Sequence, residues 1–250
     1  MASQFNAAGE YTGKSGGTRQ TIPITLHVLC RLDTALATNG DREVVCGNIG
    51  RDGGFQNHGF YIEVQRDFSA TTIFRGFTLQ GATASATVTS TVSVSTGTWY
   101  WVTLTASSST NLDIQVQSTL TTSSPSAVVP AWTTDDFSEV GRFPRSGGLE
   151  FGGSIAHYAV YSTAISTTHR DNLYNSGSGG DPDADVTPVE WWIFSELSDT
   201  ATEPAQISSP TNDMSQNVTP SFVTHPVSYG GGGGLSIPIA MHHYRHRIGA

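Results

Sequence analysis

The sequence predicts an all-β protein, an antiparallel jelly-roll β-sandwich with one short helix and a C-terminal extension. Apolar and polar residues alternate with a period of two in several segments, which is typical of strands that bury one face. Turn-prone runs such as Asn39-Gly40-Asp41 separate these segments. One segment has the start and stop signals of a helix. Many short strands with such breaks indicate a sandwich or a jelly roll.

The expected strands follow one another along the chain. In the first, at 22–32, Ile24, Leu26 and Val28 share an apolar face, whereas the opposite face is mostly polar. The same alternation predicts four more strands, and a shorter strand follows them. These segments are 60–65, 87–95, 99–105, 111–117 and 155–161.

The helix is expected over 167–174. Ser166 can cap it, because the serine hydroxyl can accept hydrogen bonds from the first free backbone amides, and Gly177 ends it. The chain then divides into four parts. They are a sandwich at 1–175, a linker at 176–188, an extension at 189–229 that packs on the sandwich or on a partner, and a glycine hinge with a docking tail at 230–250.

Composition excludes several classes of function. The 250 residues include 21 acidic and 12 basic side chains, with a formal net charge of -9. An acidic surface repels phosphate backbones, so we expect no nucleic-acid binding. No apolar run approaches the roughly 20 residues that span a bilayer, so membrane insertion is not expected. Residues 1–17 lack the apolar core of a signal peptide. Cys30 and Cys46 are expected to be reduced residues of the core.

Two stretches resemble a known family. Trp99-Tyr100-Trp101-Val102-Thr103-Leu104-Thr105 and the strand at 111–116 resemble the tryptophan-led hairpin of laminin G-like domains. Residues 153–161, followed by Ala164-Ile165-Ser166 and Leu173-Tyr174, resemble the closing strand and short helix of that family. The family often has acidic residues after the serine, where this chain has Thr167, Thr168 and His169. The resemblance covers about 5–175 and implies a concanavalin A-like lectin/glucanase fold.

A looser resemblance concerns the C-terminal extension. Glu190-Trp191-Trp192-Ile193-Phe194, with the segments 213–217 and 224–229, looks like extensions beside such domains in phage virion proteins. It implies a non-catalytic virion structural protein, as a capsid decoration or tail component, assembled in the host cytoplasm without a signal peptide. Its partners would be other virion proteins and further copies of the chain. The alternative is a carbohydrate-binding adhesin for host-surface glycans, and a glycoside hydrolase is a distant third.

Catalysis is not expected from the strand residues. Glycoside hydrolysis needs two carboxyl groups about 5–9.5 Å apart. Glu63 and Asp67 share a strand face, but they lie roughly 13 Å apart along an ideal strand, with Gln65 between them. A solvated strand face explains these residues better, so the sequence predicts that the protein is not an enzyme.

Aromatic residues suggest a glycan site. Sugar rings stack on flat aromatic faces while polar neighbours bind the hydroxyls. Trp99 and Trp101 lie on the more polar side of their strand, and Tyr61 and Arg142 could complete a site. Packing beneath the helix or a loop is the alternative for both tryptophans.

No cofactor is required, although calcium is possible. Asp181, Asp183 and Asp185 alternate in a Gly/Pro loop like the start of a calcium loop, but Val186 and Trp192 replace its glycine and glutamate. An exposed acidic linker is the alternative. Laminin G-like domains also bind calcium at the sandwich rim, which makes Asp41, Asp52 and Asp113 possible donors.

The C-terminal tail combines apolar and basic residues. It is expected to dock on a partner, because exposed apolar residues gain from being covered. Disorder, or a metal pair formed by His242 and His246, are alternatives. The docking residues are Leu235, Ile237, Ile239, Tyr244, Arg245 and Arg247.

Overall fold

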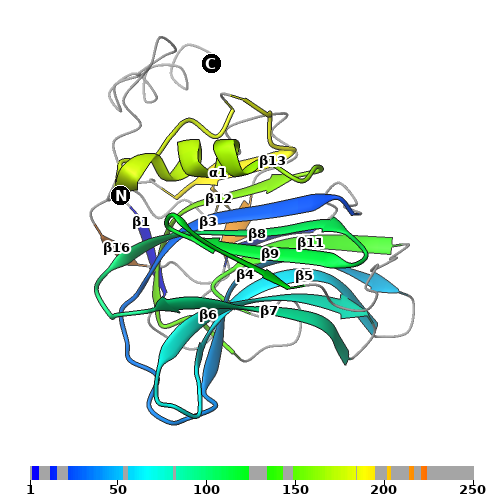
Figure 1. Cartoon of the computed structure of the whole chain (residues 1–250). Coiled ribbons are helices and arrows are strands. Elements are labelled where there is room, and N and C mark those ends of the chain that lie inside the picture. The colour runs from blue at the N-terminus through cyan, green and yellow to red at the C-terminus, as the bar shows by residue number, and fades with distance from the viewer. Residues whose placement is uncertain are drawn as a thin grey trace.

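Two antiparallel sheets face each other in a computed structural model of the chain (Figure 1). The described residues are 2–5, 12–15, 22–52, 56–80, 83–123, 134–142, 149–183, 185–194, 202–203, 214–216 and 221–223. Among them, no helix is long and apolar enough to cross a membrane. The predicted docking residues between 235 and 247 lie outside this part of the chain.

Sheet A contains eight of the described strands. Its order is β10-β9-β8-β3-β12-β1-β16, and β13 also pairs with β12. The strands are β10 (Thr119–Ser123), β9 (Asn111–Val116), β8 (Trp99–Ser108), β3 (Ile24–Leu32), β12 (Gly153–Tyr161), β1 (Ala2–Phe5), β16 (Ser221–Val223) and β13 (Glu190–Ile193).

Sheet B contains eight more, in the order β14-β15-β2-β11-β4-β5-β6-β7. They are β14 (Thr202–Glu203), β15 (Met214–Gln216), β2 (Thr12–Ser15), β11 (Thr134–Val140), β4 (Arg42–Asp52), β5 (Gln56–Arg66), β6 (Thr72–Gln80) and β7 (Thr83–Ser93). Every strand pair in both sheets is antiparallel. The predicted antiparallel sandwich is therefore confirmed.

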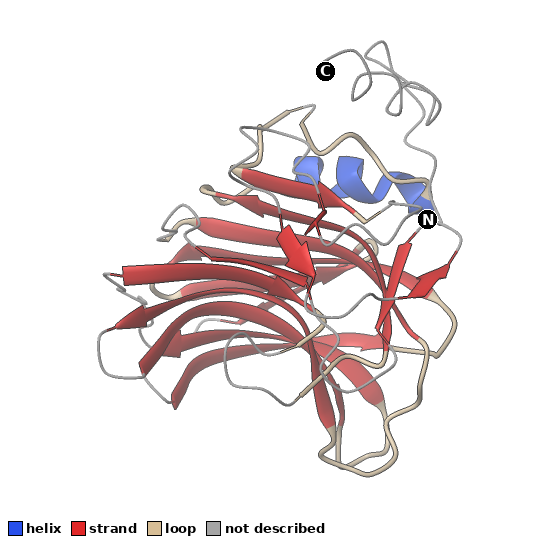
Figure 2. Ribbon diagram, turned by 180° about the vertical axis from the view of Figure 1, so that it is seen from behind, coloured by secondary structure: helices blue, strands red, loops and turns tan. Residues whose placement is uncertain are grey.

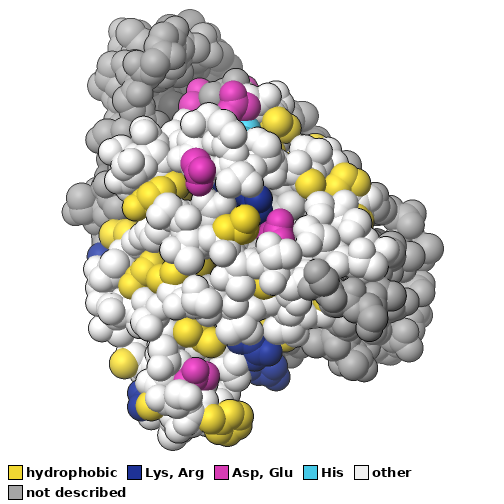
Figure 3. Space-filling model, in the orientation of Figure 1, with side chains coloured by type: hydrophobic (Ala, Val, Ile, Leu, Met, Phe, Trp, Pro, Cys, Tyr) yellow, Lys and Arg dark blue, Asp and Glu magenta, His cyan; other side chains and the backbone are white. Residues whose placement is uncertain are grey.

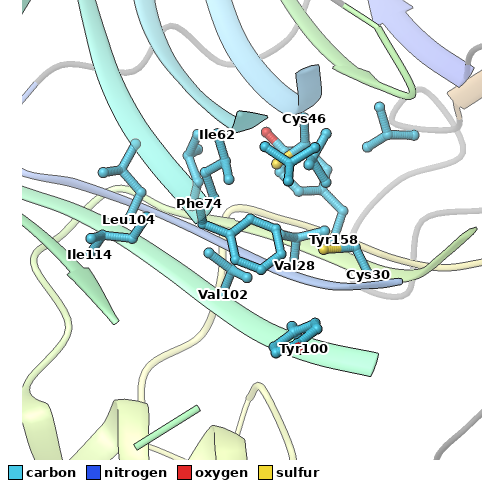
Figure 4. Packing of buried hydrophobic residues seen from close by; sticks show 14 of the residues in the cluster. Val28, Cys30, Cys46, Ile62, Phe74, Tyr100, Val102, Leu104, Ile114 and Tyr158 are labelled. Carbon is cyan, nitrogen blue, oxygen red and sulfur yellow. The ribbon is translucent and has the colours of Figure 1, made fainter. Parts of the chain in front are cut away.

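The main core lies between the two sheets. Val28 and Val102 of sheet A and Ile62 and Phe74 of sheet B contribute to it, as Figure 4 shows. These positions follow from the alternation in the sequence, because residues two apart on a strand point to the same side. Both cysteines are free and fully buried in this core, as expected.

The helix α1 (Thr167–Tyr174) has the predicted bounds. The hydroxyl of Ser166 accepts a hydrogen bond from the backbone N–H of His169 at 3.1 Å, which caps the first turn. Asn175 ends the helix in the left-handed region, and a short 3-10 turn, η1 (Asn175–Gly177), follows. Figures 1 and 2 show the helix on the outer side of sheet A.

The helix and the segment after it bury the second face of sheet A. All nine residues of β12 are buried, and so are Thr25, His27 and Leu29 on the mostly polar face of β3. The expectation of strands with one buried face is therefore wrong for the centre of this sheet. Leu173 of α1 packs against Ala159 of β12 in a cluster separate from the main core.

Residues 190–194 also belong to the sandwich. β13 pairs with β12, and Trp192 stacks on Tyr158 with ring centroids 5.6 Å apart and planes at 10°. Trp192 and Phe194 are fully buried in the main core. The boundaries predicted at 175 and 189 stay predictions.

Candidate functional site

Trp101 lies in a buried layer between sheet A and α1. Its ring stacks on that of His27, with ring centroids 5.2 Å apart and planes at 14°. Nδ1 of His27 lies 2.7 Å from Oγ1 of Thr103. Burial, with a smaller effect of His169, lowers the pKa of His27 to about 3. Only 4% of Trp101 is exposed, so this side chain packs in the layer and offers no open face to a sugar.

Trp99 is half-buried beside the same layer. Strand pairing places Trp99, Arg31 and Ser154 in one row across sheet A. The guanidinium carbon of Arg31 lies 5.1 Å from the centroid of the Trp99 ring. Arg31 donates from Nε to Oδ1 of Asp33 at 2.5 Å, and Ser154 donates to Oδ2 of Asp33 at 2.5 Å. This network holds the indole at the start of β8.

Tyr61 and Arg142 belong to the opposite side of the molecule. Tyr61 stacks on Phe77, with ring centroids 4.8 Å apart and planes at 2°, in a cluster outside the main core. Arg142 donates from Nε to Oε2 of Glu139 at 3.1 Å. The register of sheet B pairs Glu139 with Gly47 and Gly47 with Tyr61. The four predicted glycan residues therefore lie on two different sheets.

The three aspartates considered for calcium do not converge. Oδ1 of Asp181 accepts from the backbone N–H of Asp183 at 3.0 Å. Oδ2 of Asp185 accepts from Nδ2 of Asn172 at 3.0 Å and lies 3.5 Å from Nδ1 of His169. Within the described part of the chain, no group of three or more His, Cys, Asp or Glu residues could hold a metal ion. Calcium binding by these side chains stays a prediction.

A pocket of about 440 Å³ opens where β3 leads into β4. Its walls come from the β3–β4 connection, the start of β4 and the segment before β12. They are formed by Ala35, Leu36, Ala37, Gly40, Asp41, Arg42, Glu43 and Leu149. Leu149 packs against the cluster that contains Tyr61. The pocket thus borders the cluster that contains Tyr61.

Two carboxylates, two residues apart, line the pocket. Both oxygens of Asp41 accept from Thr38, at 2.7 Å from its N–H and 2.6 Å from its hydroxyl, and these hydrogen bonds lower the pKa of Asp41. Oε2 of Glu43 accepts from the N–H of Gly152 at 2.8 Å. Burial raises the pKa of Glu43, and the nearby Asp41 adds to the increase. This pair of carboxylates does not lie on one predicted strand face, because Asp41 precedes β4.

Arg42 and Glu43 present polar groups to the pocket. Arg42 is exposed, and its guanidinium has no hydrogen-bond partner in the described part of the chain. Oε1 of Glu43 likewise has no partner among the described residues. A donor and an acceptor therefore line the same pocket as the apolar side chains of Leu36 and Leu149. Arg42 and Glu43 are consecutive residues of β4, so their side chains leave the strand on opposite faces, and the pocket borders both. A few polar groups among apolar walls are typical of small-molecule sites.

An exposed phenylalanine stands beside the pocket. Phe68 is 87% exposed in the β5–β6 turn. Oδ1 of Asp67 fixes the turn by accepting from the N–H groups of Ser69 and Thr71 at 2.9 and 2.8 Å. The carbonyl of Phe68 accepts from Nδ2 of Asn39 at 3.2 Å. This hydrogen bond joins the turn to the β3–β4 connection at 33–41, called the pocket loop below. The sequence gives no signal for Phe68, because one aromatic residue in a polar turn has no periodicity.

Charges are sparse on the visible surface. On the face drawn in Figure 3, uncharged polar side chains and backbone predominate, and acidic and basic side chains occur in small scattered groups. This view shows no extended basic patch, in agreement with the net charge of -9.

Comparisons with known proteins agree with this architecture. A laminin G model, described as the concanavalin A-like lectin/glucanases superfamily, matches residues 23–169. No curated protein matches the chain. These results and the structural neighbours give no indication of a virus particle.

Three solved structures illustrate the shared fold. A putative carbohydrate-binding protein from Bacteroides ovatus is 16% identical, with a TM-score of 0.57, over 92% of this chain and 61% of that protein. A heptameric pentraxin from Limulus polyphemus is 11% identical, with a TM-score of 0.52, over 87% and 94%. The CBM40 of a Ruminococcus gnavus sialidase, bound to α2,3-sialyllactose, is 14% identical, with a TM-score of 0.52, over 68% and 94%. The chain thus spans 61% of the length of the Bacteroides protein.

Proposed function

Because the chain belongs to the concanavalin A-like lectin/glucanases superfamily, we propose that it is a non-catalytic carbohydrate-binding module. One observation carries the proposal: Arg42 and Glu43 line a pocket with apolar walls at the β3–β4 end of the sandwich, beside the exposed Phe68. A volume of about 440 Å³ lies in the usual range for small-molecule sites.

The pocket offers the two kinds of contact that a sugar uses. A sugar ring has apolar C–H faces, which can pack on Leu36, Leu149 or the ring of Phe68. Its hydroxyl groups can donate to Oε1 of Glu43 and accept from the guanidinium of Arg42. Charged partners make such hydrogen bonds stronger than neutral ones.

The surroundings of the acidic residues favour binding over hydrolysis. Glycoside hydrolysis needs one free carboxylic acid and one free carboxylate across the scissile bond. Both oxygens of Asp41 are engaged by Thr38, so among the described lining residues Glu43 has no second free carboxyl group to work with. Glu63 is fully buried against Arg75, with Nη1 of the arginine 3.3 Å from Oε1. Asp67 accepts hydrogen bonds from the backbone of its own turn.

A virion role, which the sequence favoured, gains no support from these findings. It depended on a loose resemblance in the C-terminal extension, and residues 190–194 of that extension instead complete the sandwich. The family match and the structural neighbours favour the lectin-like alternative. Calcium binding, self-association and docking through the tail stay predictions.

The test is a glycan array probed with the full chain, followed by calorimetry on the best ligands. Phe68→Ala and Glu43→Gln are each expected to weaken binding about fivefold or more, since each removes or weakens one contact of roughly 1–3 kcal/mol. Leu120→Ala is the matched control, because Leu120 is also exposed but lies on β10. Equal losses in all three variants, or release of reducing sugar by the wild-type chain, would contradict the proposal.

A further inference from the structure

We infer that the pocket takes uncharged sugars and rejects sugars that carry a carboxylate. This inference rests on the proposed function and adds the class of ligand. Among the described residues, Asp41, Arg42 and Glu43 are the charged ones that line the pocket. Two of them are acids, so the charge of the lining is negative when both carboxylates are ionised.

The negative charge of Asp41 is fixed by the fold. Its two oxygens accept from the backbone N–H and the hydroxyl of Thr38, and hydrogen bonds to a carboxylate favour its ionised form. The same hydrogen bonds hold the carboxylate close to the pocket loop. Asp41 therefore stays charged and in place when a ligand enters.

Arg66, which contacts the pocket loop, already makes hydrogen bonds within the protein. Arg66 donates from Nη1 to the carbonyl of Leu36 at 3.1 Å and from Nε to Oδ1 of Asn39 at 3.1 Å. These contacts join the pocket loop to the end of β5. In the part of the chain that the structure describes, Arg42 is then the one cation lining the pocket, and its two chain neighbours are the acids.

This arrangement favours ligands rich in hydrogen-bond donors. A sugar hydroxyl can donate to a carboxylate, whereas a sugar carboxylate can only accept and meets like charge. Two like charges about 6 Å apart weaken binding by roughly threefold to a hundredfold, depending on how well water screens them. The net charge of -9 adds long-range repulsion against acidic polysaccharides.

Matched pairs of oligosaccharides test the inference. Galactotriose and trigalacturonate differ at C6, where the second carries carboxylates. Lactose and α2,3-sialyllactose differ by one sialic acid residue, which carries the carboxylate. All four would be titrated into the full chain, together with the neutral ligands found on the array. Neutral members are expected to bind at least about fivefold more tightly at low salt, with a smaller difference at high salt. Glu43→Gln is expected to narrow the difference, whereas Asp183→Asn, an exposed acid outside the pocket, is expected to leave it unchanged.

The outcomes separate the two proposals. Equal or tighter binding of the acidic members would overturn the inference and leave carbohydrate binding standing. Failure of every sugar on the array to bind would overturn the proposed function itself. A thermal melt of Glu43→Gln checks that a changed preference does not come from unfolding.

Discussion

Two tryptophans of β8 illustrate how position decides the role of a residue. Trp101 is 4% exposed between the sheet and the helix, whereas Trp99 is half-buried at the start of the strand. Trp101→Ala is expected to lower the free energy of unfolding by about 3–5 kcal/mol, because it leaves a cavity under α1. Trp99→Ala is expected to cost less, since Trp99 is already partly exposed. Urea denaturation measures both, and equal costs would contradict this assignment.

If the proposed sugar binding uses Glu43, the ionisation of this residue is expected to make the binding depend on pH. Burial raises its pKa above the ordinary 4.5, so it takes up a proton at a higher pH than an exposed glutamate. Protonation removes a charged acceptor, and the association constant is therefore expected to fall as pH decreases, with a midpoint above pH 4.5. Calorimetric titrations from neutral to acidic pH measure this loss. Glu43→Gln is expected to bind more weakly and without that pH dependence.

The sequence indicated only part of the candidate site. The turn at Asn39-Gly40-Asp41 was visible, because glycine and short polar residues mark turns. Periodicity reports which face of a strand a residue occupies, but it does not report which loops meet at the end of a sandwich. Glu43 and Phe68 were missed for that reason. Tyr61, expected to stack on a sugar, is buried and stacks on Phe77 in the cluster against which Leu149 packs.

At the scale of an element, the buried layer beneath α1 is expected to make the protein less stable in acid. His27, His157 and His169 are buried there, and Nη1 of Arg170 lies 3.5 Å from Oδ2 of Asp113. His27 is flanked by Trp101 and Thr103 of β8 and by His157 of β12, with Trp191 of β13 next to His157. The layer thus holds three imidazoles and a guanidinium, with Asp113 and Asp185 as its paired acids.

The sign of the effect follows from His27. Its pKa is about 3 in the folded chain and 6.5 without burial, so the unfolded chain binds more protons between these values. Stability is expected to fall by about 1.4 kcal/mol for each pH unit below 6.5 from this group alone. Urea denaturation at pH 7 and pH 5 measures the loss. In His27→Gln the pH dependence is expected to be smaller, and an unchanged slope would rule out His27 as its source.

The burial and capping of some elements could be predicted from their own sequence, and those of others could not. The main-core faces of β3, β8 and β9 were predictable, because each alternates apolar and polar residues. The burial of both faces of β12 was not, since it depends on α1 packing across the sheet rather than on β12 itself. The cap at Ser166 was predictable, because capping is local to a few residues.

At the scale of the whole molecule, the sandwich is completed by residues far along the chain. Trp192 and Phe194 fill the main core, although they follow the predicted linker at 176–188. A chain that ends at residue 188 would lose both side chains and the pairing of β13 with β12. Removing a large buried aromatic typically costs about 3–5 kcal/mol, and a domain is stable by only about 5–15 kcal/mol.

A truncation series tests this dependence. The chain ending at 188 is expected to be unfolded or to melt at least about 10 °C below the full chain, because the two lost aromatics remove most of the margin of stability. A matched truncation at 234 keeps β13 and removes only the predicted docking tail, so its melting temperature is expected to stay close to that of the full chain. Calorimetry measures the melting temperatures of the full chain and of the two truncated chains. If the chain ending at 188 melted like the full chain, residues 190–194 would be an accessory to the sandwich rather than a part of its core.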